Sequence, residues 1–229
     1  MMKSREWCIF TAAAILFCLT FVLPSQAASI NTLANWDGYT GIDQLGETWA
    51  YSVWVSRSYG ETFKITSSDA KLNAITFGIW DYYPQYASQT CKFEVVVSAW
   101  NGSQPTGPVL FRSAPLIPPN GSSWSVMTAA MGNVPVTKDQ QYIAFLTTTS
   151  FMDGIQSPAA VSAVINDVYA DGAMFFHTAF GPGDELTSGW SSAGAIDMAF
   201  KLDYTNVPEP ATLLLLGLGA AIIRRRRAS

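Results

Sequence analysis

Hydrophobic and polar positions in the central part of the chain alternate or form short β-branched runs, and no long segment follows the helical period. Gly, Pro, Asn and Asp bound these runs, which is the pattern of strands separated by turns. Residues 157–169 fit a short helix or a long loop equally well. The pattern predicts about nine strands, over residues 48–55, 61–65, 72–80, 92–99, 109–112, 123–127, 141–148, 173–176 and 197–204.

Two of these segments also indicate which side chains face the core, because every second residue of a strand lies on the same face. In the segment 92–99, Glu94 falls on the face opposite to the one that carries Phe93 and Val95. Short strands at this spacing predict an all-β fold, an antiparallel β-sandwich, with a closed up-and-down sheet as the alternative. The residues predicted to face the core are Ile75, Phe77, Ile79, Phe93, Val95 and Val97.

The N-terminal segment has two basic residues, an apolar run over residues 7–23, and small residues after it. This order describes a secretory signal peptide. Ser25 and Ala27 occupy the small positions before the cleavage point, so the prediction is removal of residues 1–27 by signal peptidase after passage through the Sec translocon. A retained membrane helix is the alternative, and the short apolar run argues against it.

The C-terminal 23 residues have three parts: a proline-flanked glutamate (Val207, Pro208, Glu209, Pro210), an apolar stretch (211–223) and a basic end (Arg224, Arg225, Arg226, Arg227). The apolar stretch is predicted to form a single transmembrane helix of 13 residues. Such a helix is about 20 Å long, which is short for a hydrocarbon core of roughly 30 Å. Arginines stay on the cytoplasmic side of the membrane. The passenger, residues 28–206, is therefore expected outside the membrane.

This order of parts resembles the PEP-CTERM sorting domain found in Gram-negative bacteria that make an exopolysaccharide matrix. The resemblance rests on Pro208, Glu209 and Pro210, on the Leu-rich stretch and on the arginine end. It implies recognition by an exosortase, a transpeptidase-like membrane enzyme that processes the tail near the motif. It also implies anchoring in the inner membrane before processing, and a place at the cell surface or outside the cell afterwards.

The passenger resembles the jelly-roll sandwiches of the galactose-binding-like kind that PEP-CTERM proteins often carry. The resemblance rests on the segment Gly60-Glu61-Thr62-Phe63 and on an element with Val97, Trp100, Gly102 and a Pro-rich stretch over residues 105–110. It implies a fold of two facing antiparallel sheets.

The passenger has seven basic and 15 acidic residues, which gives a formal charge of −8. Nucleic acid is excluded as a partner, because its phosphates need clustered Lys and Arg. The length fits one domain. Cys91 is the single cysteine left after removal of the signal peptide, so no internal disulfide forms. We expect this thiol at a strand end, partly packed.

Candidate catalytic groups are few. His177 is the single histidine and cannot build a multi-His zinc site. We expect it at a strand end on a solvated face, and no Gly-x-Ser-x-Gly elbow accompanies it. Carboxylates for glycoside hydrolysis would come from Asp167, Asp171, Asp184 and Glu185, which read as loop residues. The prediction is that the protein is not an enzyme, with a secreted glycan hydrolase as the third hypothesis.

Acidic residues also offer oxygen ligands to a hard cation. Asp153, Asp167 and Asp171 are the candidates for calcium. Because no EF-hand or repeat loop is present, we assign no metal and no other cofactor from the sequence, and calcium remains the alternative.

Binding fits the passenger better than catalysis. Seven of the eight tryptophans lie in it, and the apolar faces of sugar rings stack on aromatic rings. Trp80, Tyr82 and Tyr83 form the first candidate segment, and Trp100 with Asn101 forms the second. The sequence therefore predicts a non-enzymatic protein of the cell surface or extracellular matrix. The alternative is a carbohydrate-binding module that acts as an adhesin or exopolysaccharide linker.

Overall fold

The computed structural model describes residues 26–50, 52–81, 89–119, 121, 123–187 and 189–207. Several residues singled out above lie outside these ranges: Ser25, Tyr82, Tyr83, Pro208, Glu209, Pro210, Arg224, Arg225, Arg226 and Arg227. Within the described part, Ala27–Asn206 forms one compact unit. No helix in that part is both long enough and apolar enough to cross a membrane, and the predicted span over 211–223 lies outside it.

The described chain is all-β, and every pairing between its named strands is antiparallel, which confirms the predicted class. The strands are β1 (Ala27–Asn31), β2 (Gly41–Ala50), β3 (Val53–Lys64), β4 (Ala70–Asp81), β5 (Glu94–Trp100), β6 (Pro105–Arg112), β7 (Ser125–Val136), β8 (Gln141–Thr147), β9 (Ala159–Ile165), β10 (Met174–Ala179), β11 (Ser191–Ser192), β12 (Ile196–Met198) and β13 (Phe200–Asn206). The helical elements are η1 (Leu33–Asn35), η2 (Thr149–Phe151) and α2 (Asp184–Thr187).

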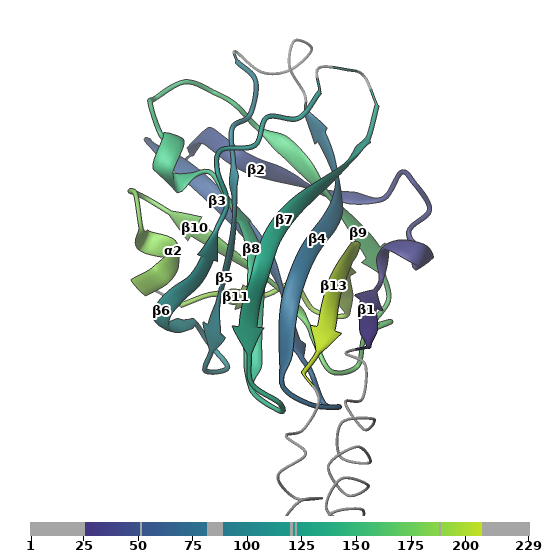
Figure 1. Cartoon of the computed structure of the whole chain (residues 1–229). Helices are drawn as coiled ribbons and strands as arrows, with labels where there is room; N and C mark the ends of the chain where they lie inside the picture. The colour runs from purple at the N-terminus through teal and green to yellow at the C-terminus, as the bar shows by residue number, and fades with distance from the viewer. Residues whose placement is uncertain are drawn as a thin grey trace, which may run out of the picture. The chain divides into compact units, whose positions relative to one another are not determined.

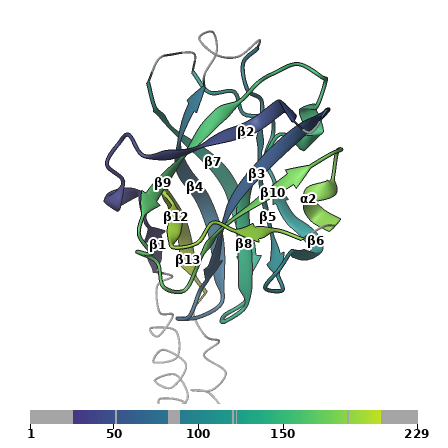
Figure 2. The same ribbon diagram turned by 180° about the vertical axis from the view of Figure 1, so that it is seen from behind.

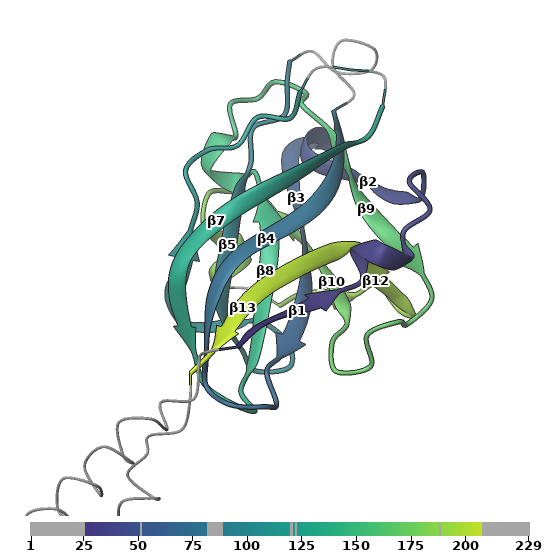
Figure 3. The same cartoon turned by 45° about the vertical axis from the view of Figure 1, so that its right-hand side comes forward.

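The strands form two facing layers (Figures 1 and 2). In the first layer β4 pairs with β7 on one side and β13 on the other, and β13 pairs with β1. The second layer has the order β10-β3-β8-β5-β6. Figure 3 shows β7, β4 and β13 in front of β5 and β8. This is a β-sandwich.

Strand β2 joins the two layers. Residues 41–45 pair with β9, and residues 46–50 pair with β3. Gly46 sits at the change of partner with a φ of +110°, and a Cβ there would lie 2.2 Å from the carbonyl oxygen of Ser157. Only glycine fits this position, because it tolerates positive φ and leaves room for the neighbouring backbone.

The main core lies between the layers. All six residues predicted to face it are 0% exposed, so the predicted core face is confirmed. The opposite face of β5 is also covered, because Trp190 packs on Phe145 with ring centroids 5.0 Å apart and on Trp100 at 6.2 Å. The chain around α2 therefore shields the outer face of the second layer, and Glu94 does not face open solvent.

Three predictions about the elements are wrong. Residues 48–55 are not one strand but the end of β2, a turn and the start of β3, with Ser52 at a φ of +64°. Residues 157–169 contain a strand, β9, rather than only a helix or loop. This strand is buried on both faces, so its sequence shows no alternation. Cys91 is fully buried rather than partly packed, and this burial raises the pKa of its thiol.

Candidate functional site

The two tryptophans predicted to bind ligand lie in different layers. Trp80 is near the end of β4, opposite Ala160 of β9, whereas Trp100 ends β5, opposite Pro105 of β6. The structure therefore does not bring them together into one site.

Trp80 belongs to a cluster of three indoles. The ring of Trp124 lies 6.2 Å from that of Trp80 and 5.2 Å from that of Trp36. A Cβ on Gly41 would meet Trp124 Cη2 at 2.1 Å, and one on Gly78 would meet Trp36 Cη2 at 2.9 Å. Because the indoles occupy the space that two glycines leave, this cluster is packed against the strands, and its three rings are partly buried.

Trp100 is 8% exposed and lines a surface cavity of about 520 Å³. Its ring packs against that of Phe175 of β10, with centroids 4.8 Å apart and an interplanar angle of 55°. Thr62, Gln141 and Asp171 also line the cavity, so its wall combines aromatic and polar groups. Asn101 and Gly102, in the turn after β5, complete the same wall.

Polar groups at the rim are held in place by short contacts. Asp171 forms an ion pair with Lys64, Nζ to Oδ1 3.4 Å, and 53% of its side chain stays exposed. Gln141 donates through Nε2 to the backbone oxygen of Asp171 at 3.3 Å. The Asn101 Oδ1 accepts from the backbone nitrogens of Ser103 and Gln104, at 2.9 and 3.0 Å. These bonds fix the turn that carries the Asn101 amide.

The loop that carries Asp171 lies directly against β3. A Cβ on Gly172 would lie 2.2 Å from the carbonyl oxygen of Thr62, so a larger residue does not fit there. The backbone nitrogen of Ala173 donates to Thr62 Oγ1 at 2.9 Å. Asp171 is therefore presented by a loop that is pinned on both sides of Gly172.

This arrangement suits a polar ligand with apolar faces. Aromatic rings offer a stacking surface, while a carboxylate and two amides offer acceptors and donors for hydroxyl groups. A cavity of this volume is in the range of small-molecule sites. Of the residues that line this cavity, the sequence analysis named Trp100 and Asn101 but not Phe175 and Gln141, because nothing local in their segments marks them as ligand-facing.

His177 does not lie on a solvated face, so that prediction is wrong. It is 5% exposed in the middle of β10 and packs beside Trp190, with ring centroids 5.7 Å apart. Its Nδ1 lies 3.2 Å from the carbonyl oxygen of Gly189. The chain after α2 covers it, which the strand pattern alone does not show.

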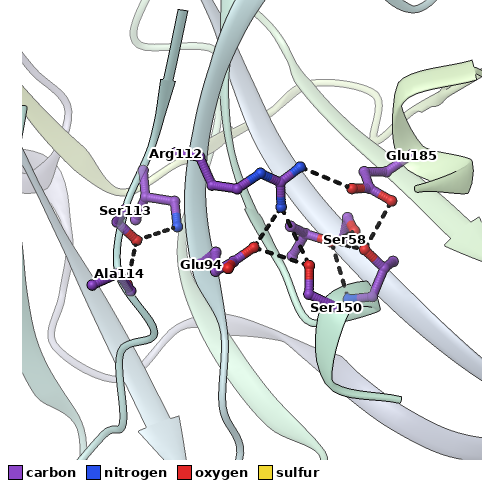
Figure 4. Close-up of polar contacts among 10 residues, drawn as sticks. Ser58, Glu94, Arg112, Ser113, Ala114, Ser150 and Glu185 are labelled. Atoms are coloured by element: carbon purple, nitrogen blue, oxygen red, sulfur yellow. Dashed lines mark hydrogen bonds and ion pairs between the residues drawn. The ribbon is translucent and has the colours of Figure 1, made fainter. Parts of the chain in front are cut away.

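The four candidate hydrolytic carboxylates do not share one role. Asp184 Oδ2 accepts from the backbone nitrogen of Phe180 at 2.9 Å. Glu185 is 0% exposed, so its prediction as an open loop carboxylate is wrong. It accepts from Thr149 Oγ1 at 2.8 Å and lies 3.6 Å from Arg112 (Figure 4). The structure thus uses both acidic residues of α2 for internal contacts, and Asp171 lines the Trp100 cavity.

Of the three candidate calcium ligands, Asp167 is exposed after β9, and the other two have partners within the chain. Asp153 accepts from Gln89 Nε2, with both carboxylate oxygens at 3.0 Å, and Asp171 is paired with Lys64. In the described ranges, no group of three or more His, Cys, Asp or Glu side chains is arranged to hold a metal ion.

The residues that follow the sandwich match a known family. The final strand β13 ends at Asn206. Residues 206–227 match the family model described as PEP_exosort_dom, PEP-CTERM protein-sorting motif. This chain carries a PEP-CTERM sorting motif. The PEP-CTERM motif implies export, membrane anchoring before processing, and an exosortase as the processing partner, and the all-β passenger fits such a substrate.

Other comparisons with the PEP-CTERM chain are distant. No curated protein matches it. A clostridial cysteine protease, Cwp84 after propeptide cleavage, is 10% identical over 79% of this chain, with a TM-score of 0.48. The cysteine protease and lectin-like domains of Cwp84, a surface layer associated protein of Clostridium difficile, are 13% identical over 67%, with a TM-score of 0.40. A Podospora anserina GH26-CBM35 beta-(1,4)-mannanase is 17% identical over 62%, with a TM-score of 0.25.

The PEP-CTERM chain spans 40%, 33% and 30% of these three structures. At these values the resemblance assigns neither a ligand nor an activity to it.

Proposed function

We propose that this protein is a non-enzymatic component of the cell surface or extracellular matrix. It is anchored in the inner membrane through the segment 211–223 until exosortase cleaves near Glu209, and is then retained in extracellular polysaccharide. The sorting motif at residues 206–227 is the observation that carries the proposal. The internal roles of His177 and Glu185 support a passenger without catalysis.

Replacing Glu209 by Ala, or deleting residues 208–210, is expected to leave uncleaved protein in the membrane fraction. The processing enzyme is expected to recognise the proline-flanked glutamate, so loss of this residue stops cleavage while translocation continues. Cell fractionation in the native host, with mass spectrometry of the mature C-terminus, measures this. Asp203→Asn, an acidic-to-neutral change in β13, is the control and should be processed normally. An intact C-terminus on wild-type protein outside the cell would contradict the proposal.

A second function is favoured by the cavity beside Trp100: binding of a neutral polysaccharide. Support comes from the aromatic wall of the cavity, formed by Phe175 and the largely buried Trp100 with their rings tilted by 55°, and from the amide and carboxylate groups at the rim. The acidic passenger and the carboxylate of Asp171 disfavour an acidic glycan, because like charges repel. The galactose-binding-like jelly roll remains our proposal for the class of the sandwich, supported by its two antiparallel layers.

Asp171→Asn combined with Gln141→Ala is expected to weaken polysaccharide binding by about tenfold or more. Gln141→Ala removes an amide, and Asp171→Asn replaces a charged acceptor by a neutral amide; a hydrogen bond to a charged group contributes about 1.5–3 kcal/mol. Affinity electrophoresis of the full chain in mild detergent, with a soluble β-glucan or galactomannan in the gel, measures the change. Asp203→Asn is a matched control, since Asp203 is also paired with a lysine, Lys201, at 2.8 Å. Equal retardation of the double variant and the control would refute the cavity as the binding site.

A further inference from the structure

The tip of the β2–β3 hairpin carries exposed aromatic surface that the Trp100 cavity does not include. Trp49 and Trp54 are directly opposite each other in the hairpin register, with ring centroids 5.4 Å apart at 73°. Trp49 is 60% exposed, and Val53 beside it is 42% exposed. Ile155, in the loop after η2, is 43% exposed. We call Trp49, Val53, Trp54 and Ile155 the tip patch.

The tip patch is held on a fixed support. Glu47 of β2 is 2% exposed, and its two carboxylate oxygens accept from the backbone nitrogens of Asp153 and Gly154, each at 2.8 Å. A Cβ on Gly154 would lie 3.5 Å from Trp54 Nε1, so this loop packs directly on the indole. The backbone nitrogen of Ser157 donates to the Glu47 carbonyl at 3.0 Å. An exposed indole on a loop anchored this way loses little conformational entropy when a ligand covers it.

Hydrogen-bonding groups lie on the same loop that packs on Trp54. Asp153, the residue before Gly154, is exposed. Both of its carboxylate oxygens lie 3.0 Å from Gln89 Nε2, which donates to them. The backbone nitrogen of Gln89 donates to the Gln156 carbonyl at 3.3 Å, which ties this residue to the same loop. A carboxylate and an amide next to an exposed indole are the groups that hydroxyl-bearing rings require.

We propose that the tip patch, with Asp153 and Gln89, is a second carbohydrate-binding site for neutral polysaccharide. A hexose ring stacks its C–H face on Trp49, and its hydroxyl groups donate to Asp153 and accept from Gln89. The carboxylates of Asp153 and Glu47 disfavour uronic acids and sulfated sugars at this site. The proposal rests on the function proposed above and extends it from one binding site to two.

The two sites lie at opposite ends of strand β3. Trp54 is the second residue of β3 and Thr62, in the wall of the Trp100 cavity, is eight residues further along. At about 3.3 Å per residue this separates the sites by about 26 Å. A protein with two such sites engages two segments of polymer at once, so it cross-links polysaccharide chains and gains affinity from bivalency.

The test uses the full chain in mild detergent with soluble β-glucan, galactomannan and polygalacturonate as probes. Turbidity reports cross-linking, and titration calorimetry with short β-glucan oligosaccharides reports affinity and the number of sites. The wild type is expected to show two sites and to raise turbidity with a neutral polymer, but not with polygalacturonate. Trp49→Ala should leave one site and no cross-linking, because loss of a central aromatic contact weakens a site by about tenfold or more. Val126→Ala, an exposed apolar change in β7 outside both proposed sites, should behave as the wild type.

Combining these variants with Asp171→Asn separates the two proposals. If Trp49→Ala keeps both sites and full turbidity, the tip site is refuted. If in addition Asp171→Asn removes binding, the proposed cavity function stands. If Trp49→Ala removes all binding and Asp171→Asn none, the tip site stands and the cavity is refuted. If light scattering shows that Trp49→Ala dissociates a dimer and leaves binding intact, the tip patch contacts a second copy and the proposal is overturned.

Discussion

Raising the pH from about 5 to about 9 is expected to lower the free energy of unfolding, and Glu61→Gln is expected to remove most of this dependence. Glu61 of β3 is 0% exposed. Its Oε2 accepts from the backbone nitrogen of Met198 at 2.8 Å, whereas its Oε1 has no hydrogen-bond partner among the described residues. Burial, and to a smaller extent the nearby carboxylates of Asp197 and Asp167, raise the pKa of Glu61 to about 9, against the opposing effect of the hydrogen bond from Met198.

The sign of the effect follows from proton linkage. The folded state keeps Glu61 protonated above the ordinary glutamate pKa of 4.5, where the unfolded state has released its proton. The unfolded state therefore binds fewer protons in this window, and stability falls as the pH rises. The slope is on the order of 1 kcal/mol per pH unit for one such group. Burial also raises the pKa of Asp197, which adds in the same direction.

Urea denaturation of wild type and Glu61→Gln at pH 5, 7 and 9 measures this effect. The glutamine keeps the acceptor for Met198 without a titrating group, so the variant should be more stable than the wild type at pH 9 and similar to it at pH 5. Asp203→Asn, an exposed carboxylate, is the control and should keep the wild-type slope. A wild-type stability that is constant over this range would show that Glu61 reaches water or an unseen partner.

The burial of Glu61 could not be predicted from the pattern of its own segment. Residues 61–65 are predicted to form a strand, and β3 confirms this prediction. Glu61, however, shares the inward face of β3 with Phe63. Its hydrogen bond comes from Met198, 137 residues away. Local alternation does not contain such a contact, because tertiary packing decides which polar residue is enclosed.

Alternation was sufficient where one face of a strand meets the core and the other does not. It identified Ile75, Phe77 and Ile79 correctly. It failed for β9, where both faces are buried, and it did not indicate that the outer face of β5, which carries Glu94, is covered by the chain around α2. The missing information in both cases is the position of a covering segment distant in sequence.

The candidate site shows the same limit. Trp100 was predicted from its residue type and its turn, whereas the ring beside it, Phe175, comes from β10 and the rim carboxylate, Asp171, from the preceding loop. The tip patch was not predicted, since residues 48–55 were read as one strand and so placed Trp49 and Trp54 on opposite faces. Because the turn between β2 and β3 was not predicted, the pairing of Trp49 with Trp54 across the hairpin was not predicted either.

Arg112→Met is expected to destabilise the protein by about 3 kcal/mol, because it leaves two enclosed carboxylates without a cation. Arg112 of β6 contacts Glu94 of β5 through Nη1 and lies 3.6 Å from Glu185 of α2 through Nη2 (Figure 4). Glu94 is 8% exposed and Glu185 is 0% exposed. Arg112 itself is about a third exposed, with 31% of its side chain accessible, so the low end of the range for broken buried pairs applies.

The same change should loosen the chain that covers the second layer. Glu185 lies in α2, and its carbonyl oxygen accepts from Trp190 Nε1 at 2.9 Å. Repulsion between Glu94 and an uncompensated Glu185 therefore acts on the segment that places Trp190 over Phe145. A red shift of tryptophan fluorescence below the main unfolding transition is expected for Arg112→Met.

Two comparisons decide whether burial of the carboxylates is the cause. Lys201→Met breaks the exposed pair with Asp203, 2.8 Å long, and should cost less than about 1 kcal/mol. Adding Glu94→Gln and Glu185→Gln to Arg112→Met should recover most of the lost stability, because neutral amides do not need the cation and can keep the contacts to Ser150 and Thr149. If Arg112→Met is no more destabilising than Lys201→Met in urea, the carboxylates must be hydrated, and α2 would then be held by the apolar contacts of Trp190 and its hydrogen bond to the Glu185 carbonyl.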